Sequence, residues 1–130
     1  MEQSDPAVDR LGIACAPDGD GGWVATMTVS ENDLNSHGVC HGGIVFLLAD
    51  AVFDRVTNSD LPADQVAYAA HASIDFARAG QIGDVLSARG SARDRWGRST
   101  LVDVSVSNQD NDIVAHFRGH TRTVTKKDAK

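Results

Sequence analysis

The chain has 130 residues, of which 42% are hydrophobic and 23% are charged. This composition is typical of globular proteins and excludes intrinsic disorder, and the length predicts a single domain over residues 1–130. Twelve Lys and Arg residues against eighteen Asp and Glu residues give a formal net charge of −6. Because broad binding to nucleic acid requires a basic face, this charge argues against a nucleic-acid partner.

The first residues contain neither the basic nor the apolar stretch of a secretory signal peptide. The longest unbroken apolar run, Ile44 to Ala49, is far shorter than the ~20 residues that span a bilayer. Cys15 and Cys40 are too few for a disulfide framework and form no Cys-x-x-Cys pair. We therefore expect a cytoplasmic protein with free thiols and no membrane partner.

In chain order, the first predicted element is a short helix at residues 5–12, at the end of an N-terminal segment 1–12, with Pro6 in its first turn. A glycine-rich turn follows at residues 18–22. Apolar and polar residues then alternate over residues 23–29, which is typical of a strand with one buried face.

Residues 42–55 interrupt this β pattern. The segment is too long for a typical strand, and it is apolar on nearly every side up to Phe53. Since a helix that is apolar all round is a buried helix, we expect a long helix at the centre of the fold.

From Gln65 onward the sequence alternates with period two, which predicts four long strands. Turns at residues 80–83, 96–98 and 108–112 separate them, so we expect an antiparallel meander with one buried face. Six residues of the first of these strands are expected to share one face: Val66, Tyr68, Ala70, Ala72, Ile74 and Phe76. Residues 126–130 are expected to form a frayed tail.

One long helix followed by four strands predicts an α+β fold in which a curved antiparallel sheet wraps around the helix. A single sheet of this size cannot cover every side of the helix. We therefore expect a partner chain.

Asp50 is a carboxylate among the apolar residues of the predicted helix. Burial is costly for such a group and raises its pKa, which suits it to act as a general base or nucleophile. The alternative is a narrow polar stripe, formed with Asp54 and Thr57, that faces water.

His41, Gly42 and Gly43 precede or open the same helix, whose first N–H groups have no partner within it and can hold a developing oxyanion. Alternatively, the glycines allow the loop to approach another backbone closely. Gly42 and Asp50 are about 12 Å apart along a helix with a rise of ~1.5 Å per residue. If both act on one carbonyl, they must come from different subunits.

Other polar clusters admit two interpretations each. His37, Cys40 and His41 suggest metal ligands, but their spacing matches no zinc motif and we expect no metal. Several arginines form either a solvated face or a phosphate-binding rim for a nucleotide-bearing substrate. Arg89, Arg93 and Arg95 are expected to share one strand face, and Arg118 and Arg122 a face of the last strand.

Three short motifs lie close together: Asn35-Ser36-His37-Gly38, Cys40-His41-Gly42-Gly43 and Leu48-Ala49-Asp50. Further matches are Ile74-Asp75-Phe76-x-Arg78-x-Gly80 and Phe117-Arg118-Gly119. Together they resemble the PaaI-type thioesterases, the phenylacetate-degradation branch of the hotdog-fold acyl-CoA thioesterases. The resemblance covers about residues 11–123.

The resemblance implies a hotdog fold, two protomers that share a continuous sheet, and further pairing into a homotetramer. It implies hydrolysis of acyl-CoA thioesters without a cofactor, with aryl-acetyl or hydroxylated aryl-acetyl CoA as the expected substrate. Asp50 matches the catalytic carboxylate and Gly42 the amide that polarises the thioester carbonyl. The residues expected to contact substrate are Asn35, His41, Gly43, Arg93 and Arg95.

The sequence is also compatible with two other functions. A non-catalytic acyl-CoA-binding protein would have the same fold, and so would an enoyl-CoA hydratase-like enzyme. The sequence departs from the family pattern next to the catalytic acid, where the family commonly has a small or hydroxyl residue. Here Ala51 follows Asp50, and a second acid, Asp54, lies one turn further along the predicted helix. We expect this second acid to raise the pKa of Asp50 or to face solvent.

Overall fold

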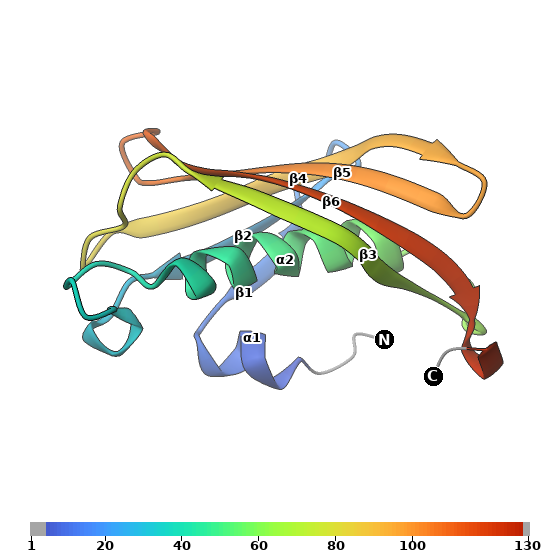
Figure 1. Ribbon diagram of the computed structural model, residues 1–130, viewed down its shortest axis with the longest axis horizontal. Helices are drawn as coiled ribbons and strands as arrows, with labels where there is room; N and C mark the ends of the chain where they lie inside the picture. Colours follow the sequence, from blue (N-terminus) through green and yellow to red (C-terminus); the bar gives the residue numbers. More distant parts are fainter. Residues whose placement is uncertain (1–4, 129–130) are drawn as a thin grey trace.

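Helix α2 (Gly42–Asn58) lies along one face of a curved antiparallel sheet in the computed structural model, which describes residues 5–128 (Figure 1). The other elements are α1 (Pro6–Arg10), β1 (Ala14–Pro17), β2 (Trp23–Thr28), a 3-10 turn (Glu31–Asp33), β3 (Gln65–Phe76), β4 (Val85–Trp96), β5 (Ser99–Ser107), β6 (Ile113–Thr125) and a second 3-10 turn (Lys126–Asp128). The predicted α+β hotdog architecture is confirmed.

Within the described part of the chain, six strands form one sheet in the order β1-β2-β4-β5-β6-β3, and every neighbouring pair is antiparallel. Short turns join β4 to β5 and β5 to β6, as predicted. The expected pairing of β3 with β4 is wrong, because β3 pairs with β6 at the edge of the sheet. The connection between β3 and β4 instead crosses beside the start of α2, where the Cys40 N–H donates to the Gly80 carbonyl at 2.7 Å.

The core lies between α2 and the sheet. Leu48 and Val52 of α2 are fully buried, and the ring of Phe53 lies 5.4 Å from that of Phe117 in β6. A Cβ placed on Gly119 would lie only 2.6 Å from atoms of the Phe53 ring, so the helix can approach β6 only because Gly119 has no side chain. No helix within residues 5–128 is long and apolar enough to cross a membrane.

A bulge divides β3 into two parts. The register of β3 against β6 shifts between Ala69 and His71. Ala67 is buried before the bulge, Ile74 packs against the core after it, and Tyr68 is exposed on the opposite face. The prediction that one set of alternate residues shares a face along the whole strand is therefore wrong, because the extra residue reverses the alternation.

A second bulge divides β4, with Arg93 as its extra residue. Before it, Arg89 lies opposite the exposed Ser105, whereas beyond it Arg95 lies opposite the buried Thr100. The predicted common face of these arginines is therefore wrong.

The ends of the chain also differ from the prediction. The short N-terminal helix is present as α1, and its first turn contains Pro6. Strand β1 was not predicted, because it is short and lacks clear alternation. The expected frayed tail is wrong for Lys126–Asp128, which form a 3-10 turn, and residues 129–130 lie outside the described part.

Candidate active site

The start of α2 presents one unused backbone donor. His41 is the N-cap residue, and its Nδ1 accepts the N–H of Gly43 at 3.0 Å. The next two N–H groups, of Ile44 and Val45, donate to the His41 carbonyl at 2.9 and 3.1 Å. The N–H of Gly42 has no acceptor among the described residues. Since the positive end of the helix dipole lies here, this N–H is suited to bind a carbonyl oxygen or an anion.

The loop before α2 is organised by Asn35. Its Oδ1 accepts the N–H groups of His37 at 2.9 Å and Val39 at 3.3 Å, while its own N–H donates to the Val39 carbonyl at 2.8 Å. Gly38 has a φ of +78°, which closes this turn and favours glycine. Asn35 therefore holds the loop in this conformation through three hydrogen bonds.

A cavity of about 360 Å³ adjoins the start of α2. Its lining residues are Asn35, Val39, Cys40, Gly42, Val45, Phe76, Ala77, Arg78, Ala79 and Gly80. Phe76 is 54% exposed although it is a large apolar residue, and a Cβ on Gly42 would lie 3.2 Å from its Cζ. An apolar wall and one backbone donor therefore meet in the same cavity.

Arg78 is the charged residue of this cavity, and it was not among the predicted substrate-binding residues. Its Nη1 donates to the Ile113 carbonyl at 2.9 Å, which fixes the guanidinium next to β6. The motif around Phe76 contained Arg78, but no local pattern indicates that the connection after β3 returns to the start of α2.

Asp50 lies two turns further along α2, on the same unbroken helix as Gly42. The Asp50 side chain is partly exposed and does not line the cavity at Gly42. The pKa of Asp50 is raised by burial, and to a smaller extent by the negative charges of Asp54 and Asp5. The expected raised pKa is therefore confirmed in direction.

Asp54 lies one turn beyond Asp50 and is solvent-exposed. The pKa of Asp54 is nevertheless raised, because nearby protein atoms displace part of its hydration water and because Asp5 carries a like charge. The charge of Arg55 and the hydrogen bond from the Asn58 amide act in the opposite direction. The expectation that α2 is buried on every side is wrong for this single chain, because these two acids form a polar stripe on its side away from the sheet.

The other predicted substrate-binding residues are distributed over the chain. Gly43 and His41 are joined by the capping hydrogen bond, but neither lines the cavity. Arg93 and Arg95 are exposed on β4 and do not line it either. In one chain, only Asn35 and Gly42 of the predicted site residues share the cavity.

Metal ligation and a cysteine nucleophile find no support in the site. Residues 5–128 contain no group of three His, Cys, Asp or Glu side chains that could hold a metal ion. Burial, together with the charge of Asp33, raises the pKa of the Cys40 thiol to about 11. Since the thiolate is the reactive form, this thiol is unreactive near neutral pH.

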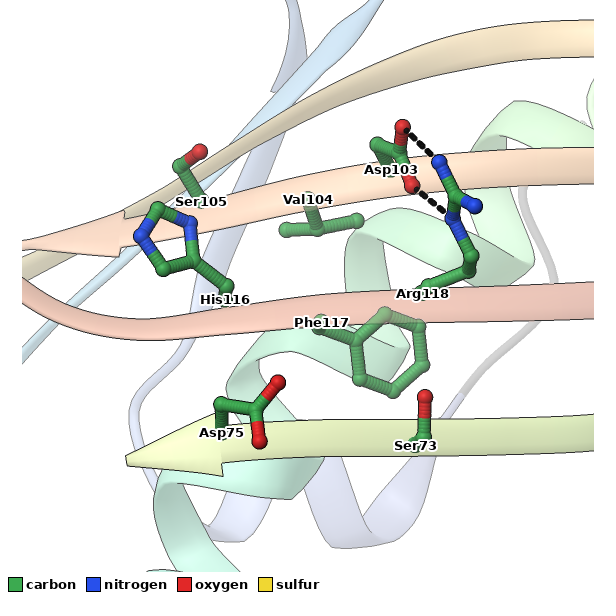
Figure 2. Close-up of a pocket in the computed structure, with 8 residues that line it drawn as sticks. All are labelled: Ser73, Asp75, Asp103, Val104, Ser105, His116, Phe117 and Arg118. Carbon is green, nitrogen blue, oxygen red and sulfur yellow. Dashed lines mark hydrogen bonds and ion pairs between the residues drawn. The ribbon is translucent and has the colours of Figure 1, made fainter. Parts of the chain in front are cut away.

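A larger cavity, of about 460 Å³, lies on the face of the sheet opposite to α2 (Figure 2). Arg118 is held there by two hydrogen bonds to Asp103, of 2.6 and 2.9 Å. This pairing lowers the pKa of Asp103, so the carboxylate is a weak base. No helix N-terminus opens into this cavity, and we therefore regard the cavity at Gly42 as the candidate site.

Residues 37–115 match the thioesterase superfamily. Over 124 residues, the chain is 37% identical to the acyl-coenzyme A thioesterase PaaI of Escherichia coli strain K12, which covers 95% of this chain and 86% of that protein. The solved structure of the E. coli PaaI protein superposes with a TM-score of 0.85 at 36% identity, over 93% of this chain and 86% of that one.

A second solved structure, of a Streptococcus mutans UA159 protein bound to acetyl CoA, is 26% identical and has a TM-score of 0.77. The match covers 88% of this chain and 90% of that one. The relatives are therefore similar over nearly the whole chain, including the cavity and α2.

Proposed function

Because the chain belongs to the thioesterase superfamily and is an acyl-CoA thioesterase of the PaaI type, we propose that Gly42 and Asp50 of two different copies catalyse the hydrolysis. The single observation that carries this proposal is that Gly42, whose N–H has no acceptor among the described residues, lines the cavity at the start of α2. A thioester carbonyl placed there would gain a hydrogen bond that strengthens as negative charge develops on its oxygen.

The position of Asp50 supports a site shared between two copies. Eight residues of α2 separate it from Gly42, which corresponds to about 12 Å along the helix axis. A carboxylate side chain cannot span this distance to a carbonyl held at Gly42. We therefore assign each site the Gly42 of one copy and the Asp50 of its partner.

In this mechanism the ionised Asp50 takes a proton from water as the water oxygen attacks the thioester carbon. The tetrahedral intermediate carries its negative charge on the oxygen held by Gly42. Its collapse breaks the carbon–sulfur bond and releases CoA thiolate, which takes up a proton, together with the free acid. Alternatively, Asp50 attacks the carbonyl carbon directly, and water then hydrolyses the mixed anhydride.

Single-turnover hydrolysis in 18O-labelled water distinguishes these two routes. Label in the Asp50 carboxylate supports direct attack, because water that opens the mixed anhydride at the Asp50 carbonyl carbon leaves its oxygen there. Label in the product acid alone is the result of general-base action, and it excludes an anhydride that is opened at the Asp50 carbonyl carbon.

The cavity also suggests a substrate. Phe76, Val39 and Val45 form an apolar wall next to Gly42, which suits an aryl-acetyl or hydroxylated aryl-acetyl group. Arg78 of the same cavity provides a cation for a phosphate of CoA, and Arg93 and Arg95 are further candidates from β4.

A dimer would form at the edge strand β3. Such a strand leaves backbone N–H and C=O groups unpaired, and Tyr68 and Phe76 of β3 are 55% and 54% exposed. Pairing of two β3 strands would give one continuous sheet, and we expect two such dimers to form a homotetramer.

Replacement of Asp50 by Asn tests the proposal. We expect Asp50→Asn to keep the fold and the oligomer but to lose about 10²–10⁴-fold in kcat, the usual contribution of a general base. Release of free thiol from aromatic and aliphatic acyl-CoA esters is the measurement. A fully active variant contradicts the assignment, and a wild-type protein that binds these esters without releasing thiol is a binding protein instead.

A further inference from the structure

One aromatic ring lies against the backbone of Gly42. Strand β3 ends beside the start of α2, and its last residue is Phe76 (Figure 1). A Cβ built on Gly42 would lie 3.2, 3.5 and 3.7 Å from Cζ, Cε1 and Cε2 of this ring. The tip of the ring therefore fills the space beside the Cα of Gly42, next to the N–H that has no acceptor among the described residues.

The backbone that carries this ring is fixed by hydrogen bonds. From His71 to Phe76, β3 pairs with β6 without a shift in register. Directly after Phe76, the N–H groups of Ala77 and Arg78 both donate to the Val114 carbonyl, at 2.8 and 3.2 Å. The end of β3 is therefore held next to the start of α2, and the ring of Phe76 is held with it.

Phe76 offers the cavity an apolar surface that no other lining residue offers. Among the residues that line this cavity in the described chain, it is the only aromatic one, and 54% of it is exposed. Val45 lines the same cavity but is only 2% exposed, since most of its surface belongs to the core. A large apolar side chain that stays accessible beside a polar donor is typical of a ligand-binding pocket.

We propose that Phe76 is the specificity-determining residue of the site, and that its ring contacts the acyl group whose carbonyl oxygen is bound by Gly42. This role rests on the oxyanion-binding role proposed for the Gly42 N–H. It assigns the choice between acyl groups to one side chain of β3.

The chemistry of the thioester explains why the ring meets the acyl group. Of the two substituents on the carbonyl carbon, the acyl group is the apolar one, whereas the sulfur leads into the polar CoA arm. An aromatic acyl group can meet the Phe76 ring edge-to-face or in an offset stack, which is favourable beyond the area that it buries. A saturated group of the same size gains only the burial of apolar surface. We therefore expect Phe76 to favour aromatic over saturated acyl groups.

Three variants separate the ring from its surroundings. Phe76→Leu removes the ring and keeps an apolar side chain, whereas Phe76→Tyr keeps the ring. Tyr68→Leu is the matched control, because Tyr68 is an equally exposed aromatic residue of β3 that lies on the opposite face and does not line the cavity. This control also shows what the loss of an aromatic residue at the edge of the sheet does when the cavity is unchanged.

The measurement is the ratio of kcat/KM for phenylacetyl-CoA to kcat/KM for cyclohexylacetyl-CoA. The two esters have the same number of carbon atoms and differ in whether the ring is aromatic. We expect Phe76→Leu to lower this ratio about 3–10-fold, which is the range that one aromatic contact supplies. Phe76→Tyr and Tyr68→Leu should keep the ratio of the wild type. Phe76→Met, a second variant without a ring, replaces Phe76→Leu if that variant does not fold.

Two results contradict this role. One is a ratio that is the same in Phe76→Leu and in the wild type. The other is an equal decrease in Phe76→Leu and Tyr68→Leu, which would assign the effect to the edge of the sheet instead of the cavity.

Binding of CoA thioethers separates the role of Phe76 from the proposed function. In these analogues a CH2 group replaces the thioester carbonyl, so they cannot be hydrolysed. We expect the wild type to bind the 2-phenylethyl thioether more tightly than the 2-cyclohexylethyl thioether in isothermal titration calorimetry, and Phe76→Leu to lose this difference. That result supports the role of Phe76 even if the protein releases no thiol from any ester. Equal binding of the two thioethers by the wild type, or binding of neither, overturns it, whereas failure to release thiol overturns only the proposed function.

Discussion

At the scale of single residues, Gly42 allows a test of the chemistry with little disturbance of the fold. Its N–H has no acceptor among the described residues, so its removal breaks no hydrogen bond of the protein. The preceding residue, His41, has φ −59° and ψ 133°, the extended conformation that a residue before proline adopts. The first position of a helix also tolerates proline. Gly42→Pro therefore deletes one donor and keeps the backbone path.

We expect Gly42→Pro to lower kcat for acyl-CoA esters by about 10²–10³-fold, which is typical for the loss of one oxyanion donor. Gly42→Ala is the matched control, because it adds a Cβ at the same place and keeps the N–H. In both variants the new Cβ would lie 3.2 Å from Cζ of Phe76, so the added contact with this ring is the same in the two variants. Thiol release measures the effect, and equal losses in the two variants would assign it to the contact with Phe76 instead.

At the scale of secondary-structure elements, Asn58 joins the end of α2 to β3. Its Oδ1 accepts the N–H of Ala67 at 2.8 Å, and its Nδ2 donates to the Ala67 carbonyl at 3.1 Å and to Asp54 at 3.0 Å. Ala67 is buried, so water cannot easily replace the amide. Asn58 thus fixes the start of the edge strand relative to the helix that contains Asp50.

We expect Asn58→Ala to lower the free energy of unfolding by about 1–3 kcal/mol, because it leaves a buried N–H and a buried carbonyl without partners. Urea unfolding is the measurement. Ser59→Ala is the control, since Ser59 is the exposed residue that follows in the chain, and we expect a change within about 0.5 kcal/mol. A loss no greater than that of the control would show that the two hydrogen bonds contribute little.

The sequence predicted the elements better than it predicted their faces. The start of α2 at Gly42 was predicted, because paired glycines end the loop there and a long apolar segment follows. The faces of β3 were not, because Ala67, Ala69 and Ala72 are small residues that distinguish poorly between a buried and an exposed side. When the residues on the two faces of a strand are equally apolar, the extra residue of a bulge does not visibly change the period-two pattern of the sequence.

The site was predicted in part for a similar reason. Gly42 and Asn35 lie close together along the chain, and the structure places both at one cavity. Arg78 reaches the start of α2 only through the path of the β3–β4 connection. Such contacts depend on tertiary packing, which neither spacing nor local composition reveals.

At the scale of the whole molecule, one chain separates the two groups that the proposed reaction needs. Gly42 opens into the cavity at the start of α2, while Asp50 lies on the side of the helix away from the sheet. The chain also leaves β3 without a neighbour on one side within the described sheet. Both features are explained if the functional unit contains two copies, each of which completes the site of the other.

Mixing two inactive variants tests this arrangement directly. A dimer of one Asp50→Asn chain and one Gly42→Pro chain contains one site with both substitutions and one site with neither. If equal amounts of the two variants are unfolded together and refolded, random pairing should restore about a quarter of the wild-type activity, because half of the dimers are mixed and half of their sites are intact. Thiol release from the mixture is compared with that from each variant refolded alone. If each chain held a complete site of its own, every site in the mixture would carry one substitution and no activity would return.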